Sequence, residues 1–431
     1  MRKTLLMLSA ALIALPATAQ ITPSIPDDAP VTPIPQVAPG FDVAAAKARI
    51  AASLDKQYPH LDALYKDLHQ HPEVSFQEVR TAGILAAEMR KLGFTVTEKV
   101  GKTGIVAILK NGEGPVVMVR TELDALPLEE KTGLPYASRA QQTVDGKLTY
   151  VDHACGHDSH MAWWIGAATA LVAMKDQWHG TLMFIGQPAE ETLLGAKAMI
   201  ADGLFKRWPK PDYGFAAHVG PDQVGRVVVK EGAVTSASDK VNITFNGVGA
   251  HGSMPDKSID PVVMGSHFVT DVQTIISRER DPNLFGVISV GSFHAGTVGN
   301  IIPDHADLQL TVRSRDATTR KLLLDGITRT ARAVAEMARA PEPAVAHPAG
   351  TGVVNNDPAL SARTASVLAA AFGKQVAFVP TTMPGGNASE DYAAFIEAGV
   401  PSVFLAVGGY DPAMIARYKA EGKPVPVNHS P

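Results

Sequence analysis

The sequence predicts an α/β body, in which helices cover a β-sheet, interrupted by a smaller α+β region. Three observations support this fold class. Short apolar runs alternate with stretches of helical spacing in the first half of the chain, and the same pattern returns past about Asn355. Between the two parts, after Val229, the strand-like runs become longer and alternate between apolar and polar residues. At 431 residues, the chain also exceeds what a single hydrophobic core usually supports.

The first part of the body begins with two predicted helices. Apolar residues have helical spacing from 43 to about 68 and again from 78 to 92, where Gly93 is placed to end the second helix. Compact apolar runs then predict strands, with a helical pattern at 161–174 among them. These runs are 104–110, 116–120, 181–186 and 213–217.

The inserted region is predicted to span residues 236–342. Its alternating stretches at 240–245 and 308–312 surround one central helical pattern from 260 to 276. This arrangement predicts a separate α+β unit.

The first kind of pattern resumes after the insertion. A helix is predicted at 359–372 and a strand at 402–407. The body is therefore expected to be discontinuous, formed by residues 41–235 and 343–431.

The amino terminus predicts export. Arg2 and Lys3 precede an apolar run from 5 to 15, and Ala17-Thr18-Ala19 then forms a small-residue cleavage site. Residues 1–19 are therefore interpreted as a signal peptide, and the mature protein is expected to be secreted or periplasmic. The Pro-rich residues 20–40 are interpreted as an extended linker. The apolar run is too short to span a bilayer and no other stretch is long enough, so no membrane span is expected after cleavage.

Composition excludes one class of partner. The formal net charge is −4, which gives no electrostatic basis for binding nucleic acid. The chain has a single cysteine, Cys155, so it cannot form the intramolecular disulfides that are common in exported proteins. The neighbours of Cys155 decide between a buried inert thiol and a functional one.

Those neighbours form the motif Asp152-His153-Ala154-Cys155-Gly156-His157-Asp158, just before the helix that is predicted to start near Ser159. In extended backbone, residues two apart project to the same side, so Cys155 and His157 could reach one metal ion. Thiolate and imidazole are common zinc ligands. A buried thiol beside a capping histidine is the alternative, and this motif alone does not exclude it.

A second signal is Glu190-Glu191, which follows the predicted strand 181–186 through Gln187-Pro188-Ala189. Two adjacent carboxylates at a strand end point in different directions, so one can bind metal while the other moves protons. Open α/β sheets bind ligands at such strand ends, which favours this interpretation over a solvated turn.

Other ligand-type residues follow neighbouring strands. His218 follows the predicted strand 213–217, and Glu122 and Asp124 follow 116–120. His429 comes after the late strand and is the last candidate. Each histidine taken singly is more often a hydrogen-bonded structural residue, so the case depends on the cluster.

The pattern as a whole resembles the aminoacylase and carboxypeptidase metallopeptidase family, in particular its branch of hippurate hydrolases and auxin-conjugate (N-acyl amino acid) amidohydrolases. The resemblance covers most of the mature chain, and its motifs occur in the expected order. They are HQHPE from His69, SFQE from Ser75, RTELDALP from Arg120, DHACGHDSH from Asp152, QPAEE from Gln187, GAKAMIADGLF from Gly195, GAHGSMPDKSIDP from Gly249, GNIIPD from Gly299 and SEDY from Ser389.

The resemblance implies a zinc-peptidase-like catalytic domain with a mixed sheet, and a lid and dimerisation domain at 236–342. It implies two divalent metal ions per subunit, with zinc favoured over manganese or cobalt, and the general base Glu190. It also implies that His251 of the lid crosses to the site of a neighbouring subunit, so a homodimer is expected. Asp124 is counted with Glu190 and His251 among the catalytic residues. The implied metal ligands are Cys155, His157, Glu191, His218 and His429.

The expected substrate is a small N-acyl amino acid or dipeptide-like molecule, whose amide is attacked by a water activated at the metals. Asn300 and Arg313 of the lid are candidates to anchor its carboxylate, although Arg313 could be an ordinary solvent-facing charge and Asn300 could shape the turn before Pro303. A carboxypeptidase or dipeptidase would use the same residues. A catalytically silent binding protein is the alternative from another class.

This sequence departs from the family in two places. Glu122 stands where most relatives of this branch have aspartate, and the longer side chain could shift the residues behind the metals. Relatives also usually continue past the position of His429, whereas this sequence ends two residues after it.

Overall fold

The computed structural model describes residues 33–36, 40–348 and 350–430. The predicted signal peptide at 1–19 and most of the predicted linker at 20–40 lie outside the described residues. Within the described ranges, no helix is both long and apolar enough to cross a membrane.

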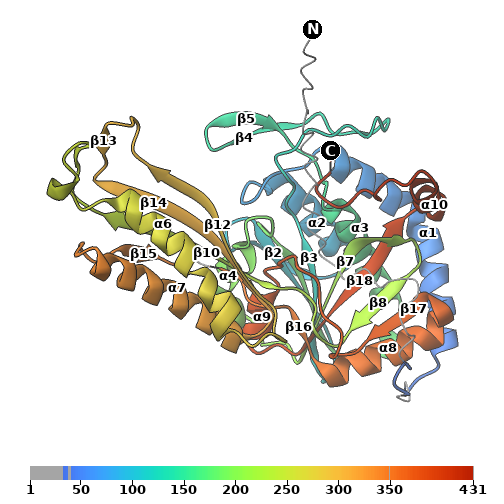
Figure 1. Ribbon diagram of the computed structural model, residues 1–431. Helices are drawn as coiled ribbons and strands as arrows, with labels where there is room; N and C mark the ends of the chain where they lie inside the picture. Colours follow the sequence, from blue (N-terminus) through green and yellow to red (C-terminus); the bar gives the residue numbers. More distant parts are fainter. Residues whose placement is uncertain (1–32, 37–39, 349, 431) are drawn as a thin grey trace, which may run out of the picture.

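The larger part of the molecule is built on an eight-stranded mixed sheet (Figure 1). In spatial order its strands are β1 (Thr95–Val100), β2 (Gly104–Asn111), β6 (Gly180–Gln187), β3 (Val116–Glu122), β7 (Tyr213–Gln223), β18 (Ser402–Tyr410), β8 (Val227–Lys230) and β17 (Val376–Val379). The four central strands, from β6 to β18, run parallel. The carboxyl ends of β6, β3 and β7 therefore meet at one edge, and the predicted α/β body with a mixed sheet is confirmed.

Helices cover both faces of this sheet, because its central strands are apolar on both sides. In β2 and β6, Ala107 and Phe184 face one layer of helices while Val106 and Ile185 face the other. The first layer contains α1 (Val43–Gln70), α2 (Val79–Lys91), α3 (His157–Ala173) and α8 (Pro358–Phe372), and the second contains α4 (Gly195–Ala201), α5 (Leu204–Arg207) and α9 (Ala393–Glu397).

A second, smaller sheet projects to one side of the body (Figure 1). Its strands, in spatial order, are β12 (Gly286–Ala295), β14 (His305–Ser314), β10 (Ala237–Asn246) and β15 (Ala344–Ala346). Two helices, α6 (Pro261–Asp271) and α7 (Ala317–Met337), share an apolar core with it. We call this unit the lid. Since β15 pairs with β10, its sheet extends past the predicted boundary at 342.

The sequence indicated one helix in the lid, and α7 was missed. Its buried residues Leu323, Ile327, Ala331 and Val334 lie three or four positions apart, which is the spacing of one helix face. Polar residues and one glycine interrupt the helix between the short apolar runs at 322–324 and 333–335.

Aspartate marks the start of several helices. An aspartate side chain accepts a hydrogen bond from a backbone N–H of the first turn, which pairs donors that the helix itself leaves free. These aspartates are Asp42, Asp260, Asp316, Asp357 and Asp411, before α1, α6, α7, α8 and α10 (Pro412–Ala420).

The remaining described elements are short. They comprise the hairpin of β4 (Gln141–Val144) and β5 (Lys147–Tyr150), the pair β9 (Gly232–Ala233) and β16 (Asn355–Asn356), the pair β11 (Ala250–His251) and β13 (Ile301–Ile302), three 3-10 turns at 175–177, 255–257 and 373–375, and a π-helical turn at 275–279.

Candidate metal centre

Cys155 and His157 converge through a sharp turn, and not through extended backbone as the sequence had suggested. His157 is the first residue of α3, and Gly156 before it has φ +85°, a left-handed conformation that glycine adopts without strain. A β-carbon on Gly156 would lie 2.5 Å from Cγ1 of Val219. Both the backbone conformation and the lack of space therefore require glycine between the two candidate ligands.

His157 presents a free nitrogen to the centre. Its Nδ1 donates a hydrogen bond to the carbonyl oxygen of Asp124 at 2.7 Å, which leaves Nε2 with a lone pair. This Nε2 is buried without a hydrogen-bond partner and lies 3.8 Å from Glu190 Oε2 and 3.9 Å from Glu191 Oε1. Burial lowers the pKa of His157, but Asp124 and the charges of Glu122 and Glu191 outweigh it and raise the pKa to about 10. The surrounding carboxylates thus favour positive charge at this ring, which a proton or a bound cation at Nε2 would supply.

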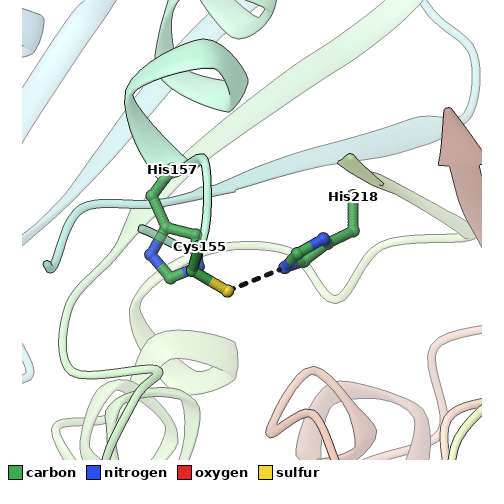
Figure 2. Close-up of side chains that lie close together, drawn as sticks. All are labelled: Cys155, His157 and His218. Carbon is green, nitrogen blue, oxygen red and sulfur yellow. Dashed lines mark hydrogen bonds between the residues drawn. The ribbon is translucent and has the colours of Figure 1, made fainter. Parts of the chain in front are cut away.

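Two further histidines lie against the sulfur of Cys155. His218 Nε2 is 3.4 Å from Cys155 Sγ, a contact drawn as the dashed line in Figure 2. The Nδ1 of His218 donates to the carbonyl oxygen of Val219 at 2.7 Å. His429 Nε2 is 3.2 Å from the same sulfur, and the backbone N–H of His429 donates to Ala154 O at 2.9 Å. The C-terminal segment therefore returns to the centre. His218 lies within β7, which continues to Gln223, past the predicted strand end.

The Glu190-Glu191 pair is held by Asp124. The two carboxylate oxygens of Asp124 accept hydrogen bonds from the backbone N–H groups of Glu190 and Glu191, each at 3.0 Å, and Ser75 Oγ donates to it at 2.6 Å. Both carboxylate oxygens thus hold the backbone of the Glu190-Glu191 pair, and Ser75 fixes the carboxylate from a third segment. Asp124 orients these segments.

The environments of the two glutamates differ. Burial, together with the nearby charge of Glu390, raises the pKa of Glu190 well above its usual range. Burial also raises the pKa of Glu191, to about 7, while the charge of His157 lowers it. Glu191 additionally lies 3.6 Å from His429 Nε2. Glu191 therefore faces more of the nitrogen and sulfur atoms, while Glu190 lies where a carboxyl group retains a proton.

The donor atoms fit divalent cations. Three overlapping groups each have all their candidate ligand atoms within 4.8 Å of one another. Each pair of groups has one residue in common, which is Cys155, His157 or Glu191. This arrangement is expected where neighbouring ions use common ligands. The unpaired Nε2 of His157 and Oε1 of Glu191 are buried polar atoms that such ions would satisfy. The groups are Cys155–His157–His218, Cys155–Glu191–His429 and His157–Glu190–Glu191.

A buried charge network behind the glutamates was not found from the sequence. The Arg120 guanidinium, fully buried, pairs with Glu122 and donates to Glu390 Oε1 at 2.7 Å. Burial alone would raise the pKa of Glu122, but Arg120 and His160 hold it well below its usual range. Glu122, at the family's aspartate position, is thus committed to Arg120 and to His160 Nδ1 at 3.0 Å. His160 could have been noticed, since it follows His157 by three residues on one helix face.

The candidates in the lid lie apart from this cluster. His251 is exposed on β11, and its Nδ1 is 2.8 Å from Ser253 Oγ. Asn300 is exposed in a turn and accepts from Gly252 N through its carbonyl oxygen at 2.8 Å. Arg313 is half-buried and donates to Ser389 Oγ of the body. Within the described residues, no hydrogen bond or ion pair joins these three side chains to Cys155 or Glu190.

Comparison with known sequences gives consistent results. A sequence model of peptidase family M20/M25/M40 matches residues 118–420. The hippurate hydrolase of Campylobacter jejuni is 40% identical over 273 residues, which cover 62% of this chain and 68% of that protein. The N-acetylcysteine deacetylase of Bacillus subtilis is 35% identical over 346 residues, covering 80% of this chain and 86% of the relative.

Solved structures have the same architecture. A Staphylococcus aureus structure superposes with a TM-score of 0.79 at 29% identity, covering 89% of this chain and 93% of the other. A Bacillus subtilis protein, described as a dinuclear metal-binding peptidase of family M20, superposes with a TM-score of 0.68 at 30% identity over 82% of this chain and 89% of its own. The predicted family resemblance is confirmed: the chain belongs to peptidase family M20/M25/M40 and is a hydrolase of carbon–nitrogen amide bonds.

Proposed function

We propose that the protein hydrolyses the amide bond of small N-acyl amino acids. The observation that carries the proposal is the Glu190-Glu191 pair, which Asp124 holds beside three histidines and one thiol. The similarity to a hippurate hydrolase and an N-acetylcysteine deacetylase supports an acylated amino acid as the substrate class.

We propose that two divalent cations bind per subunit, zinc being favoured by the sulfur and nitrogen donors. The similar Bacillus subtilis structure described as dinuclear supports two ions. Such ions polarise a carbonyl oxygen and lower the pKa of an attacking water. The proposed ligands are Cys155, His157, Glu191, His218 and His429.

The chain's own residues would then divide the proton chemistry. Glu190 removes a proton from the attacking water and returns it to the leaving amine. Burial and the charge of Glu390 raise the pKa of Glu190 above its usual range, which favours the protonated form that Glu190 takes before it passes the proton to the amine. Asp124 acts as a positioning residue, since its carboxylate holds the backbone of both glutamates and its carbonyl oxygen orients the His157 ring.

The lid would complete the site from a second subunit. We propose that His251 stabilises the oxyanion in its neighbour's site and that Asn300 and Arg313 anchor the substrate carboxylate. Two observations support this proposal. His251 is exposed and lies apart from the candidate metal ligands of its own chain, and the lid has an exposed apolar surface. β12 is an edge strand of the lid sheet, and several large apolar side chains are exposed on the lid. They are Val248, Met254, Val262, Val263, Phe293, Val298 and Ile301.

A carboxypeptidase is the second candidate function, because a carboxypeptidase of Saccharolobus solfataricus is 37% identical over 61% of this chain. A substrate panel separates the two. The purified protein is assayed on hippurate, acetyl-amino acids and dipeptides, with metal content measured on the same sample. Hydrolysis of acylated amino acids with little dipeptide cleavage supports the proposal, the reverse preference favours the peptidase, and bound metal with no hydrolysis would indicate a silent binding protein.

We also propose that the protein is exported to the periplasm or secreted. The support is the amino-terminal pattern of Arg2, Lys3, the apolar run and the Ala17-Thr18-Ala19 site. Amino-terminal sequencing of the protein recovered from cell fractions tests it. A mature chain beginning near Gln20 outside the cytoplasm is the expected result, and an uncleaved Met1 in the cytoplasmic fraction would contradict it.

A further inference from the structure

A second buried polar cluster lies behind the metal centre, and none of the roles proposed above uses it. It comprises His69 at the end of α1, Glu130, Asp152 and Asp158, each more than nine-tenths buried. His69 Nδ1 is 2.7 Å from Asp158 Oδ2. A proton on Nδ1 that is donated to Asp158 leaves Nε2 of His69 with a lone pair, in the way that a carboxylate orients a metal-binding histidine.

Two carboxylates lie near this nitrogen. His69 Nε2 lies 3.3 Å from Glu130 Oε2, which is within ion-pair range, although the contact does not meet hydrogen-bond geometry. Asp152 Oδ1 is also buried without a partner. The candidate ligand atoms of His69, Glu130 and Asp152 lie within 4.8 Å of one another. A histidine nitrogen and two carboxylates therefore converge on one point.

The charge of the cluster also calls for a cation. Three carboxylates surround one histidine, so even a protonated His69 leaves the buried cluster negative. Burial and the charge of Glu130 raise the pKa of Asp152 to about 6. Burial lowers the pKa of His69, but Asp158 and Glu130 outweigh it and raise the pKa to about 9. Burial and the neighbouring carboxylates cause both shifts, and a cation that binds Nε2 would displace the proton from His69.

We propose that His69 Nε2, Glu130 and Asp152 bind a third divalent cation, which is structural and separate from the catalytic pair. The 3.3 Å separation between His69 Nε2 and Glu130 Oε2 matches the edge of a tetrahedron with arms of about 2.0–2.2 Å, the distances of zinc to nitrogen and oxygen. The absence of sulfur distinguishes this site from the centre that contains Cys155. The second oxygen of a carboxylate or a water can take the fourth position.

The three ligands come from parts of the chain that must be fixed together. His69 ends α1, and Glu130 follows the segment after β3, where its oxygens also accept from Ser138 N and Thr132 Oγ1. Asp152 opens the turn that carries Cys155, and its backbone pairs with Leu126. A cation here would tie α1 to the segment that presents the catalytic ligands. This role does not depend on the reaction that the protein catalyses.

Metal counting tests the proposal on the full-length protein. After dialysis against zinc and removal of excess ion, the wild type should hold about three equivalents per subunit and Asp152→Asn about two. Asp145→Asn is the matched control, because it removes one exposed carboxylate from the neighbouring hairpin turn and should still hold about three. His69→Gln, which removes the nitrogen ligand, should behave as Asp152→Asn does.

Cobalt(II) loading distinguishes this site from the catalytic pair. Ions bound to Cys155 give a thiolate-to-cobalt absorption band in the near ultraviolet, whereas an ion at the sulfur-free site does not. Asp152→Asn should therefore lose one equivalent of cobalt and keep the band. About two equivalents in both the wild type and Asp152→Asn would overturn the third site and leave the proposed function intact. Loss of the band together with the equivalent would also overturn it, since the ion lost would then belong to the catalytic centre.

Discussion

The carboxylate of Glu78 accepts a hydrogen bond from the backbone N–H of Ala189 at 2.8 Å, across 111 positions of sequence. Ala189 has φ +50°, a conformation that costs energy for a residue with a side chain, and it directly precedes the Glu190-Glu191 pair. Glu78 is fully buried at the start of α2 and also accepts from Phe76 N and from Thr103 Oγ1. It therefore holds the turn that places the general base.

Two substitutions of Glu78 should separate the effect of its hydrogen bonds from that of its charge. Gln preserves an oxygen for Phe76 N and Ala189 N and supplies an amide for Thr103 Oγ1, so Glu78→Gln should keep near wild-type turnover. Glu78→Ala leaves the buried N–H of Ala189 without a partner, which costs about 1–3 kcal/mol, and should reduce kcat roughly tenfold or more with metal content maintained. Steady-state kinetics with metal analysis checks both variants. Equal losses in Gln and Ala would show that the charge, and not the hydrogen bond, matters.

The same residue predicts a pH dependence of stability in the metal-free protein. Burial and the charge of Asp124 raise the pKa of Glu78 from 4.5 to about 7 in the folded state. The stabilisation from its protonated form is thus fully present below pH 4.5 and is lost as pH rises toward 7. The loss should be on the order of 3 kcal/mol in the free energy of unfolding, and Glu78→Gln should lack it. Urea unfolding in chelator across this range measures it; parallel curves for the two proteins would refute the assignment.

Substitution of the two adjacent glutamates should have different effects on turnover and metal content. Because Glu190 is assigned the proton transfer, Glu190→Gln should lower kcat on the order of a hundredfold or more while metal content stays near that of the wild type. Glu191→Gln replaces an assigned ligand and should lower metal occupancy itself. Turnover and metal content are measured on the same preparations. Similar metal loss in both variants would overturn the division of roles.

Gly156 should not tolerate a side chain. Gly156→Ala places a β-carbon 2.5 Å from Val219 Cγ1 at φ +85°, and the left-handed conformation alone costs about 1–2 kcal/mol. Both stability and metal affinity should fall, because the turn orients Cys155 and His157. Adding Val219→Ala should recover only the part due to the clash. Gly83→Ala in α2, with no atom within 4 Å, is the control and should stabilise by about 0.5–1 kcal/mol. Thermal unfolding and zinc titration check the set, and an unaffected Gly156→Ala would contradict the turn's importance.

Mixed dimers test whether the lid acts across subunits. His251→Ala should reduce turnover on the order of a hundredfold, as loss of an oxyanion donor does elsewhere, with metal content maintained. Mixing it with Glu190→Gln should restore activity after subunit exchange, because one site of each mixed dimer then has both groups. Exchange is followed with two differently tagged chains. Exchange without recovery of activity would show that His251 acts within its own chain or has no role in the reaction.

Much of the body could be predicted because its strands are local apolar runs. The predicted runs at 104–110, 116–120 and 181–186 correspond closely to β2, β3 and β6. The lid was harder to predict. β12 is mostly exposed or half-buried, since it lies at the edge of a sheet with one covered face, and glycine, serine and histidine interrupt its apolar residues.

The centre was predictable where ligands share a short motif and less so where contacts join distant segments. The motif from Asp152 and the Glu pair are visible in the sequence. The contacts of Glu78 with Ala189 and of His69 with Asp158 depend on tertiary packing alone. Even the convergence of Cys155 and His157 was explained wrongly from sequence, because the left-handed turn at Gly156 does not appear as a residue pattern.

The position of β18 has a consequence for the order in which the molecule can assemble. This strand lies between β7 and β8, which are near neighbours in sequence, and it comes from residues 402–410. During synthesis, β7 therefore emerges long before the strand that must pair with it, and this apolar edge has no partner until β18 is made. Such distant pairing slows folding. A holding chaperone that protects this edge should thus raise the yield of refolding more than it would for a protein whose neighbouring strands are consecutive.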